Sequence, residues 1–284
     1  QRDDDRFVPE GIAIDADGRI LLGSIRHGTI VRGDEVLSSG EGHWSVFGMR
    51  FHEDGDLWFA SAAVPQFADV GPDQGKTGLF RLDTASGKIT RAALLPQLAE
   101  EQVLGDLVLA GDTIYTTDSL TGALYRYDIA ADEYMALLEP GTFGSPQGLV
   151  LDETGQYLYV ADYIGGLYRV ALGDGKVERV KMQGPASDYG IDGLYRYRDR
   201  LVAIQNGIQP HRVTSFRLSP DGTSIVEARV LAANLPEFDE PTLGAIHGDS
   251  FYFVANSHWN RFDRDNALPD GLSGPLVLKL PLAE

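Results

Sequence analysis

Apolar and polar residues alternate along much of the chain in short runs, a period-2 pattern typical of half-buried β-strands. Six segments share one order: a residue and a glycine, an alternating run, a polar turn, and a second run rich in aromatic and β-branched residues. The first reads "EGIAIDADGRILLGS" and the fifth "DGLYRYRDRLVAIQN". Each segment predicts a β-hairpin, and the six lead glycines are Gly11, Gly48, Gly105, Gly148, Gly193 and Gly244.

The hairpins recur with nearly constant length. In four segments the residue before the glycine and the end of the second run lie 14 positions apart, as from Glu10 to Ser24, and in the other two they lie 15 and 13 apart. Most segments continue with two more alternating runs, such as "GALYRYD" and "EYMALLE" after Asp118. Repeated units of four antiparallel strands predict an all-β fold, a six-bladed β-propeller with four-stranded blades that forms one domain over residues 1–284.

The last unit is one strand short, because only "PLVLKLPL" follows Asn256 as a strand-like run. We expect the N-terminal "DRFVP" to supply the missing outer strand of the last blade and so to close the ring. The stretch "LLPQLAEEQVLG" has helical character but is short, and we expect a connector there. The stretch "GPDQGKTG" from Gly71 is one residue short of a P-loop, which favours an inserted surface loop. The two "YRY" runs, at 125–127 and 195–197, are expected to pack between blades.

Composition narrows the classes of partner. The chain has 284 residues and a net charge of -18, which argues against nucleic-acid binding because phosphates need a basic surface. It has no cysteine, which excludes disulfides and thiolate chemistry, and no apolar run approaches the length of a membrane-spanning helix. The start at Gln1 without a basic and apolar leader indicates a mature or trimmed chain. We expect a periplasmic or secreted monomer with a small-molecule substrate, and a cytoplasmic location stays open.

A propeller gives the lead residues a common environment, because the innermost strand of every blade lines the central channel. Two carboxylates and one amide oxygen among them converge on the channel, and oxygen-only ligation suits a hard cation such as Ca²⁺ or Mg²⁺. A water-filled hub, or an arginine that pairs with the carboxylates, is the alternative. The predicted ring consists of Glu10, Phe47, Leu104, Gln147, Asp192 and Leu243.

These residues carry a family resemblance over the whole chain. The dipeptides in "PEG", "SPQG" and "IDG", which open the first, fourth and fifth units, resemble those of the senescence marker protein (regucalcin), gluconolactonase and luciferin-regenerating enzyme family. More distantly the chain is similar to the paraoxonases, the squid-type phosphofluoridate hydrolases and the strictosidine synthases. The resemblance implies a six-bladed propeller with one divalent cation, calcium first and magnesium, manganese or zinc as alternatives, held by Glu10, Gln147 and Asp192.

The chain also departs from that family. Gln147 replaces the usual Asn of an "NG" pair, and the third unit has Leu104, Gly105 and Asp106 where the family has an Asn-Asp pair that contacts substrate or metal-bound water. Asp106 substitutes for that Asn by a small shift, or the function is lost.

The resemblance implies hydrolysis of a small lactone or ester, with Asp192 as general base or nucleophile. A non-catalytic propeller that binds a small ligand or a protein partner is the alternative. Substrate contacts are expected from the lead positions, the ends of the second strands and the loops above the hub, with Leu243 adding to an apolar side of the cavity. The expected contacts are Phe47, Asp106, Asp118, Asp162, Tyr163, Asn206, Asn256 and His258.

Other catalytic motifs are missing from the sequence. The six histidines show no HExxH spacing, and there is no GxSxG nucleophile elbow. His43 beside Trp44 precedes the second unit and could overhang the cavity, but a loop histidine with a structural role is favoured.

Overall fold

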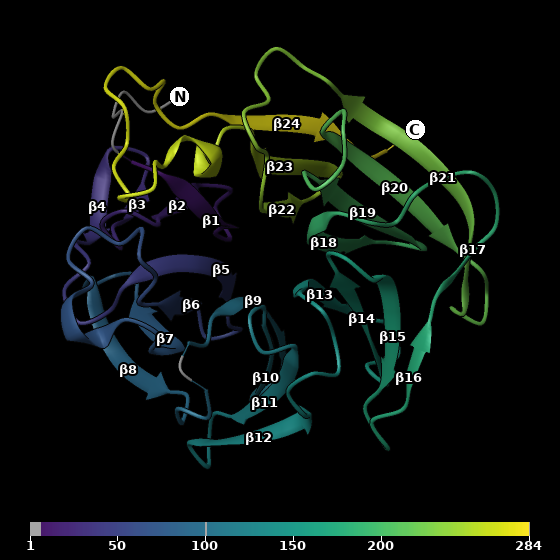
Figure 1. The fold of residues 1–284 in the computed structure, drawn as a ribbon. Helices are drawn as coiled ribbons and strands as arrows, with labels where there is room; N and C mark the ends of the chain where they lie inside the picture. Colours follow the sequence, from purple (N-terminus) through teal and green to yellow (C-terminus); the bar gives the residue numbers. More distant parts are fainter. Residues whose placement is uncertain (1–6, 100, 284) are drawn as a thin grey trace.

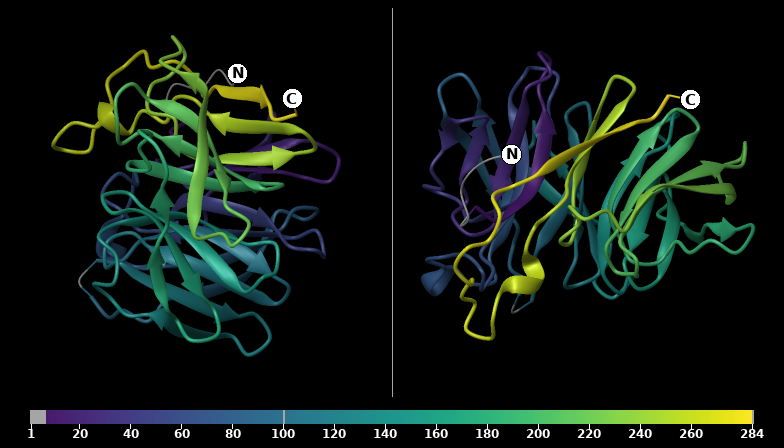
Figure 2. Two further views of the ribbon diagram at one scale, coloured as in Figure 1. Left: turned by 90° about the vertical axis from the view of Figure 1, so that its right-hand side faces the viewer. Right: turned by 90° about the horizontal axis from the view of Figure 1, so that it is seen from above.

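The computed structural model describes residues 7–99 and 101–283. Six small sheets surround a central axis, and Figure 1 looks along that axis. Neighbouring strands within each sheet are antiparallel, except for one short strand added at the outer edge of the fifth, and they follow one another outward from the hub, as the alternating pattern predicts. The six-bladed, all-β propeller is therefore confirmed, and Figure 2 shows the same ring from two perpendicular directions.

The strands of the first three blades follow the predicted order, and each of these sheets has four strands. The first blade contains β1 (Pro9–Ile14), β2 (Ile20–Ser24), β3 (Ile30–Arg32) and β4 (Glu35–Ser38). The second contains β5 (Ser45–Phe51), β6 (Leu57–Ala62), β7 (Thr77–Asp83) and β8 (Lys88–Leu94). The third contains β9 (Leu104–Ala110), β10 (Thr113–Asp118), β11 (Ala123–Asp128) and β12 (Glu133–Leu138).

The last three blades vary in strand number from four to five to three. The fourth contains β13 (Pro146–Leu151), β14 (Tyr157–Asp162), β15 (Gly166–Ala171) and β16 (Val177–Arg179). The fifth contains β18 (Ile191–Tyr197), β19 (Arg200–Gln205), β20 (Arg212–Leu218) and β21 (Ser224–Ala233), with β17 (Lys181–Met182) added parallel to β21. The sixth contains β22 (Gly244–His247), β23 (Ser250–Val254) and β24 (Val277–Pro281).

A β-bulge recurs at the start of the innermost strand in five blades. The pairing of β1 with β2 shifts between Pro9 and Ile12, so that the pair Glu10–Gly11 lies in the bulge. The same shift encloses the pairs at 47–48, 147–148 and 192–193. Bulges re-aim side chains and bend the strand. This repeated bulge places the lead side chains at the hub.

In the third blade the predicted lead residue, Leu104, is wrong. Leu104 pairs with Asp118 and is fully buried in a core cluster, whereas the bulge of β9 contains Gly105 and Asp106. In the other four bulges glycine is the second residue, but in the third blade Asp106 stands in that place and Gly105 is the first. The predicted ring position, which is counted from the glycine, is therefore one residue too early in this blade. Leu104 therefore is not a member of the ring, and Gly105 takes its place.

Close packing at the hub explains why glycine is needed in these bulges. A side chain at Gly48 would collide with Asp106 of the next blade, and one at Gly148 would collide with the backbone nitrogen of Leu194. At Gly11 it would collide with the carbonyl oxygen of Phe47. Neighbouring innermost strands thus approach more closely than any side chain permits.

The ring closes differently from the prediction. The sixth blade has three strands, Pro9 begins β1, and the N–H group of Ile25 donates a hydrogen bond to the carbonyl oxygen of Val8 at 2.9 Å. Within the described part of "DRFVP", then, the segment belongs to the first blade and adds no outer strand to the last; residues 5 and 6 lie outside the described residues. Side chains close the ring instead: Phe7, Ile12, Leu22, Val31, Leu243 and Val254 form one buried cluster between the first and sixth blades.

The connections mostly agree with the expectations. The segment between β8 and β9 contains no helix within its described residues, so it is the expected connector. The P-loop-like stretch contains a single short 3-10 helix, η1 (Gly71–Asp73), in the loop between β6 and β7. Tyr125 and Tyr127 of the first "YRY" run pack in the core cluster that contains Trp58 of the second blade. Tyr195 and Tyr197 of the second run pack with Phe251 and Phe253 of the sixth blade.

Candidate functional site in the central channel

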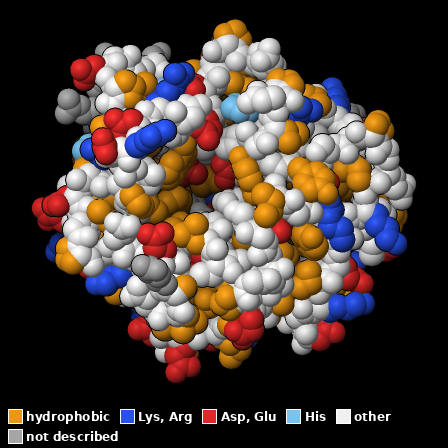
Figure 3. Space-filling view, viewed as in Figure 1, with side chains coloured by type: hydrophobic (Ala, Val, Ile, Leu, Met, Phe, Trp, Pro, Cys, Tyr) orange, Lys and Arg blue, Asp and Glu red, His pale blue; other side chains and the backbone are white. Residues whose placement is uncertain are grey.

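A cavity of about 280 Å³ lies where the lead side chains meet at one end of the channel. Figure 3 shows acidic and apolar side chains gathered in this central hollow. Thirteen residues line it, and none of them is Lys, Arg or His. The lining residues are Glu10, Phe47, Gly105, Asp106, Ser119, Gln147, Gly148, Tyr163, Asp192, Asn206, Glu240, Leu243 and Trp259.

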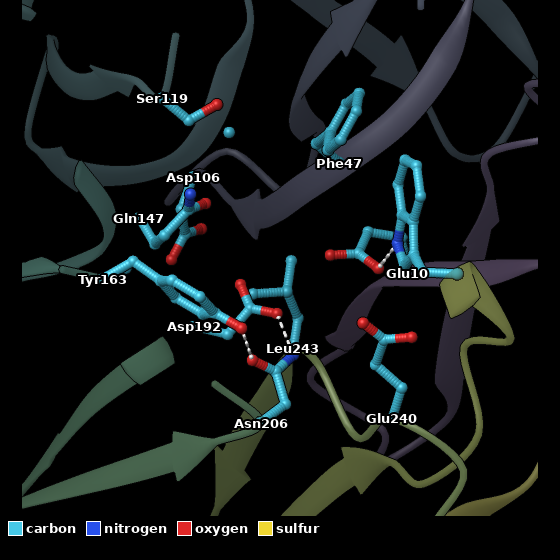
Figure 4. Close-up of a pocket in the computed structure, with 13 residues that line it drawn as sticks. Glu10, Phe47, Asp106, Ser119, Gln147, Tyr163, Asp192, Asn206, Glu240 and Leu243 are labelled. Carbon is cyan, nitrogen blue, oxygen red and sulfur yellow. Dashed lines mark hydrogen bonds between the residues drawn. The ribbon is translucent and has the colours of Figure 1, made fainter. Parts of the chain in front are cut away.

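Most of the predicted site residues meet here. The three predicted metal ligands all line the cavity, together with the two predicted apolar members Phe47 and Leu243. Four of the predicted substrate contacts, Phe47, Asp106, Tyr163 and Asn206, therefore line the cavity. Figure 4 shows Glu10, Gln147 and Asp192 around one common space.

Glu10 lies at the edge of this space with only 5% of its surface exposed. The indole Nε1–H of Trp259 donates a 2.7 Å hydrogen bond to Glu10 Oε2. Burial raises the pKa of the Glu10 carboxyl well above its ordinary value, and the negative charge of Asp192 raises it further. The hydrogen bond from Trp259 only partly offsets this rise. Glu10 is therefore a carboxylate held near a like charge without a basic side chain beside it.

Asp192 is held by a chain of two hydrogen bonds. The Asn206 amide Nδ2 donates to Asp192 Oδ2 at 2.7 Å, and the Tyr163 hydroxyl donates to Asn206 Oδ1 at 2.9 Å, as Figure 4 shows. Burial raises the pKa of Asp192 to about 7 despite the hydrogen bond from Asn206, and the charges of Glu240 and Asp106 contribute to the rise. Asp192 is thus fixed in orientation while its affinity for a proton is increased.

The Gln147 side chain is oriented by Ser145, two residues earlier in the chain. Its Nε2 donates a 3.0 Å hydrogen bond to Ser145 Oγ, and its backbone carbonyl accepts one from Thr117 Oγ1 at 2.7 Å. A side chain placed at Gly105 would meet the Gln147 Oε1 atom at 3.6 Å, so this amide oxygen lies toward the lead position of the third blade.

Asp106 lines the cavity with an almost fully buried side chain that pairs with a basic residue. Arg50 Nη2 lies 3.1 Å from Asp106 Oδ2, and the side chain of Asp106 is 2% exposed. Burial raises the pKa of Asp106, whereas the charge of Arg50 lowers it. An arginine that pairs with a hub carboxylate, the alternative to a cation, is therefore present. It is Arg50, and it pairs with Asp106 and not with Glu10 or Asp192.

Four predicted substrate contacts do not line the cavity. Asp118 accepts hydrogen bonds from the N–H groups of residues 103, 120 and 121, and Asp162 accepts them from those of 144 and 145. Asn256 binds the backbone of residues 274 and 276, and His258 contacts Asp239 and the carbonyl oxygen of residue 273. These side chains fix the loops around the hub, so their predicted contact with a ligand in this cavity is not supported by their positions.

The repeat pattern of the sequence does not identify Glu240, Trp259 and Ser119 as residues of the cavity. Glu240 precedes the sixth hairpin by a few residues and Trp259 follows His258, so neither occupies a repeated position that a comparison of blades would find. The long connection between β23 and β24 brings Trp259 to the hub, in the short helix η2 (Trp259–Arg261). Only the folded loop places these side chains in the cavity.

The donor set at the hub can be compared with the needs of a cation. Within the described residues, no three side chains among His, Cys, Asp and Glu converge as ion ligands. The remaining set is Glu10, Asp192 and the Gln147 amide oxygen. A protein N–H group holds one oxygen of each carboxylate, and Ser145 holds the Gln147 nitrogen. Two carboxylates and an amide oxygen form a set that fits a hard divalent cation whose shell waters complete.

The fold and the cavity together define a six-bladed β-propeller with an acidic central cavity. No protein-family model matches the chain. Hydrazine synthase subunit beta of Kuenenia stuttgartiensis is 27% identical over 214 residues, which cover 62% of this chain and 54% of that protein. The chain thus spans about half the length of the curated relative it matches.

Solved structures of similar fold cover nearly the whole chain. The PQQ-bound aldose sugar dehydrogenase of Streptomyces coelicolor has a TM-score of 0.67 at 14% identity and covers 97% of this chain and 94% of its own. The calcium-binding protein regucalcin of Agrobacterium tumefaciens has a TM-score of 0.64 at 16% identity, with 98% and 92% covered. A proposed gluconolactonase has a TM-score of 0.63 at 16% identity, with 90% and 88% covered. The fold implied by the sequence resemblance is confirmed.

No helix within the described residues is long and apolar enough to cross a membrane.

Proposed function

We propose that the chain is a divalent-cation-dependent hydrolase of a small lactone or ester that acts in the central cavity. One observation carries the proposal: the buried Glu10 and the half-buried Asp192 lie near each other in a cavity without a basic side chain, and an N–H donor holds one oxygen of each. Two such carboxylates either take up a proton, as their raised pKa values indicate, or are neutralised by a cation between them. The similar folds of regucalcin and a proposed gluconolactonase support the same class.

Glu10, Asp192 and Gln147 would hold the cation, with calcium first and magnesium, manganese or zinc as alternatives. A bound divalent cation polarises a substrate carbonyl and lowers the pKa of water. Asn206 fixes Asp192 through Oδ2, which leaves Oδ1 to accept a proton from the attacking water or to attack the carbonyl carbon itself. Phe47 and Leu243 supply an apolar side on which the non-reacting part of a small substrate can rest.

Calcium-dependent stabilisation tests the cation. For the wild-type chain we expect Ca²⁺ at about 100 times its dissociation constant to raise the free energy of unfolding by about 2.7 kcal/mol relative to excess chelator. Asp192→Asn and Glu10→Gln should lose most of this gain, because each removes a charged ligand but keeps the side-chain shape. Glu153→Gln, whose side chain is 85% exposed, is the charge-matched control and should keep it. Denaturant unfolding with and without each cation measures the effect. A wild-type chain that none of the cations stabilises would contradict the proposal.

A specific observation favours a second candidate, a propeller that binds a ligand without turnover. Arg50 already pairs with Asp106, the polar residue expected to assist chemistry from the third blade. Assay of a panel of lactones and aryl esters with the cation-loaded protein separates the two. Turnover that Asp192→Asn abolishes supports the hydrolase, whereas cation binding without turnover of any member supports the binding propeller.

A further inference from the structure

We propose that Glu240 and Trp259 form a subsite for an organic ammonium group, so that the ligand of the central cavity carries a protonated amine. The inference rests on the proposed function in taking this cavity as the ligand site and in placing a divalent cation at Glu10 and Asp192. The first reason is charge. Four carboxylates line the cavity, and Asp106 is neutralised by Arg50, which leaves Glu10, Asp192 and Glu240. A divalent cation held by Glu10 and Asp192 neutralises two of these three negative charges. The remaining negative charge is that of Glu240.

Hydrogen bonds hold both the side chain and the backbone of Glu240. The backbone N–H of Asn260 donates a 2.8 Å hydrogen bond to Glu240 Oε2, and the Glu240 carbonyl oxygen accepts one from Ser257 Oγ at 2.8 Å. Its backbone is left-handed, with a φ of 62°, a conformation that non-glycine residues adopt only when the surroundings impose it. Figure 4 shows the Glu240 carboxylate directed at the space that Glu10 and Asp192 share. The loop therefore presents this charge to the cavity.

Aromatic side chains line the same cavity as that charge. The Trp259 ring stacks on Phe47 with 6.3 Å between centroids and 29° between planes, and Tyr163 lines the cavity as well. The Trp259 indole is locked by its hydrogen bond to Glu10. Ammonium groups bind over aromatic faces, and most strongly over Trp, so a carboxylate combined with these rings favours an organic cation over a neutral ligand. Arg261, in the same short helix as Trp259, pairs with Asp239 at 2.9 Å, which fixes this loop to the segment that holds Glu240.

The size of the cavity limits the ligand to a small molecule. The cavity of about 280 Å³ lies near the lower end of ligand-site sizes, which suits a small amine.

Calorimetric titration with 2-phenylethylamine and its neutral analogue 2-phenylethanol tests the subsite, first in excess chelator and then with Ca²⁺. We expect the wild-type chain to bind the amine at least tenfold more tightly than the alcohol. Glu240→Gln, which keeps an oxygen acceptor for the Asn260 N–H, should lose this preference, and Trp259→Leu should weaken amine binding severalfold. Glu237→Gln, on the same loop but exposed, should match the wild type.

The outcomes separate this inference from the proposed function. Amine selectivity in chelator that Glu240→Gln removes supports the subsite even when no cation stabilises the chain, and in that case only the hydrolase proposal fails. Equal affinity for amine and alcohol, absence of amine binding, or unchanged amine affinity in Glu240→Gln overturns the subsite, whatever the cation titration shows. Far-UV circular dichroism and the denaturation midpoint of each variant establish that the substituted proteins are folded.

Discussion

His43 illustrates how burial decides the role of a single residue. It is 4% exposed, its Nε2 lies 2.8 Å from the carbonyl oxygen of Gly28, and its ring contacts that of Phe59 edge-on at 5.0 Å. It does not line the central cavity. The structural role favoured by the sequence is consistent with these contacts, although the sequence could not show that this loop folds inward against two phenylalanines.

Burial also gives His43 a pH dependence. It lowers the pKa of the imidazole below its ordinary value, partly offset by the hydrogen bond to Gly28. The unfolded chain then takes up a proton more readily than the folded protein. The free energy of unfolding should fall as the pH drops through about 6.5, by at most about 1.4 kcal/mol per pH unit from this group, and level off below the folded-state pKa.

Urea denaturation at several pH values between 5 and 7.5 measures this loss for the wild type and for His43→Gln, both in chelator. We expect the wild-type chain to lose more stability on acidification than the variant. His247→Gln, at an exposed histidine, is the matched control and should retain the wild-type dependence. An identical acid response in wild type and His43→Gln would show that another group is responsible.

At the scale of elements, the repeated bulge determines which side chains reach the hub. Each bulge aims one side chain at the channel, and the following glycine lets the next innermost strand approach. The repeated glycines are visible in the sequence, but the bulge is not, because a bulge changes the pairing of two strands without changing the composition of either. For that reason the predicted lead position of the third blade is wrong by one residue. Asp106 lies in the bulge and pairs with Arg50.

Gly148→Ala tests the close approach of β13 to β18. The new methyl group would meet the backbone of residues 192–194, which cannot rotate away as a side chain can. We expect a loss of about 3 kcal/mol in the free energy of unfolding, with some loss of ligand binding because Asp192 is displaced. Gly173→Ala, where the methyl group meets no atom within 4 Å, is the control and should leave stability nearly unchanged. Equal denaturation midpoints for the two variants would mean that the blades can separate without cost.

At the scale of the whole molecule, packing rather than strand exchange closes the ring. The sixth blade has three strands, and the joint with the first blade consists of buried apolar side chains that include Phe7 and Leu243. The long connection after β23 reinforces this joint, since Arg26 of the first blade donates a 3.1 Å hydrogen bond to the carbonyl oxygen of Asn266. The same connection carries Trp259 to the cavity.

Phe7→Ala should therefore weaken the entire propeller. Phe7 is 4% exposed, and its truncation leaves a cavity between the first and last blades, for which we expect a loss of about 3–5 kcal/mol. Val36→Ala, at a side chain that is 54% exposed, should change stability by no more than about 0.5 kcal/mol. Guanidinium denaturation followed by tryptophan fluorescence and by circular dichroism measures both. A Phe7→Ala loss below about 1 kcal/mol would show that closure does not depend on this contact.

The sequence by itself determined the architecture and most of the hub. Alternation with period 2 and six recurring glycines are local properties, and they suffice for a six-bladed propeller and for the placement of Glu10, Gln147 and Asp192 around one channel. The tertiary structure alone decided the register of the third blade, the manner of closure and the presence of Glu240 and Trp259 in the cavity. Those features depend on bulges, side-chain packing and a long loop that crosses between blades, and such contacts between distant residues leave no repeat in the sequence.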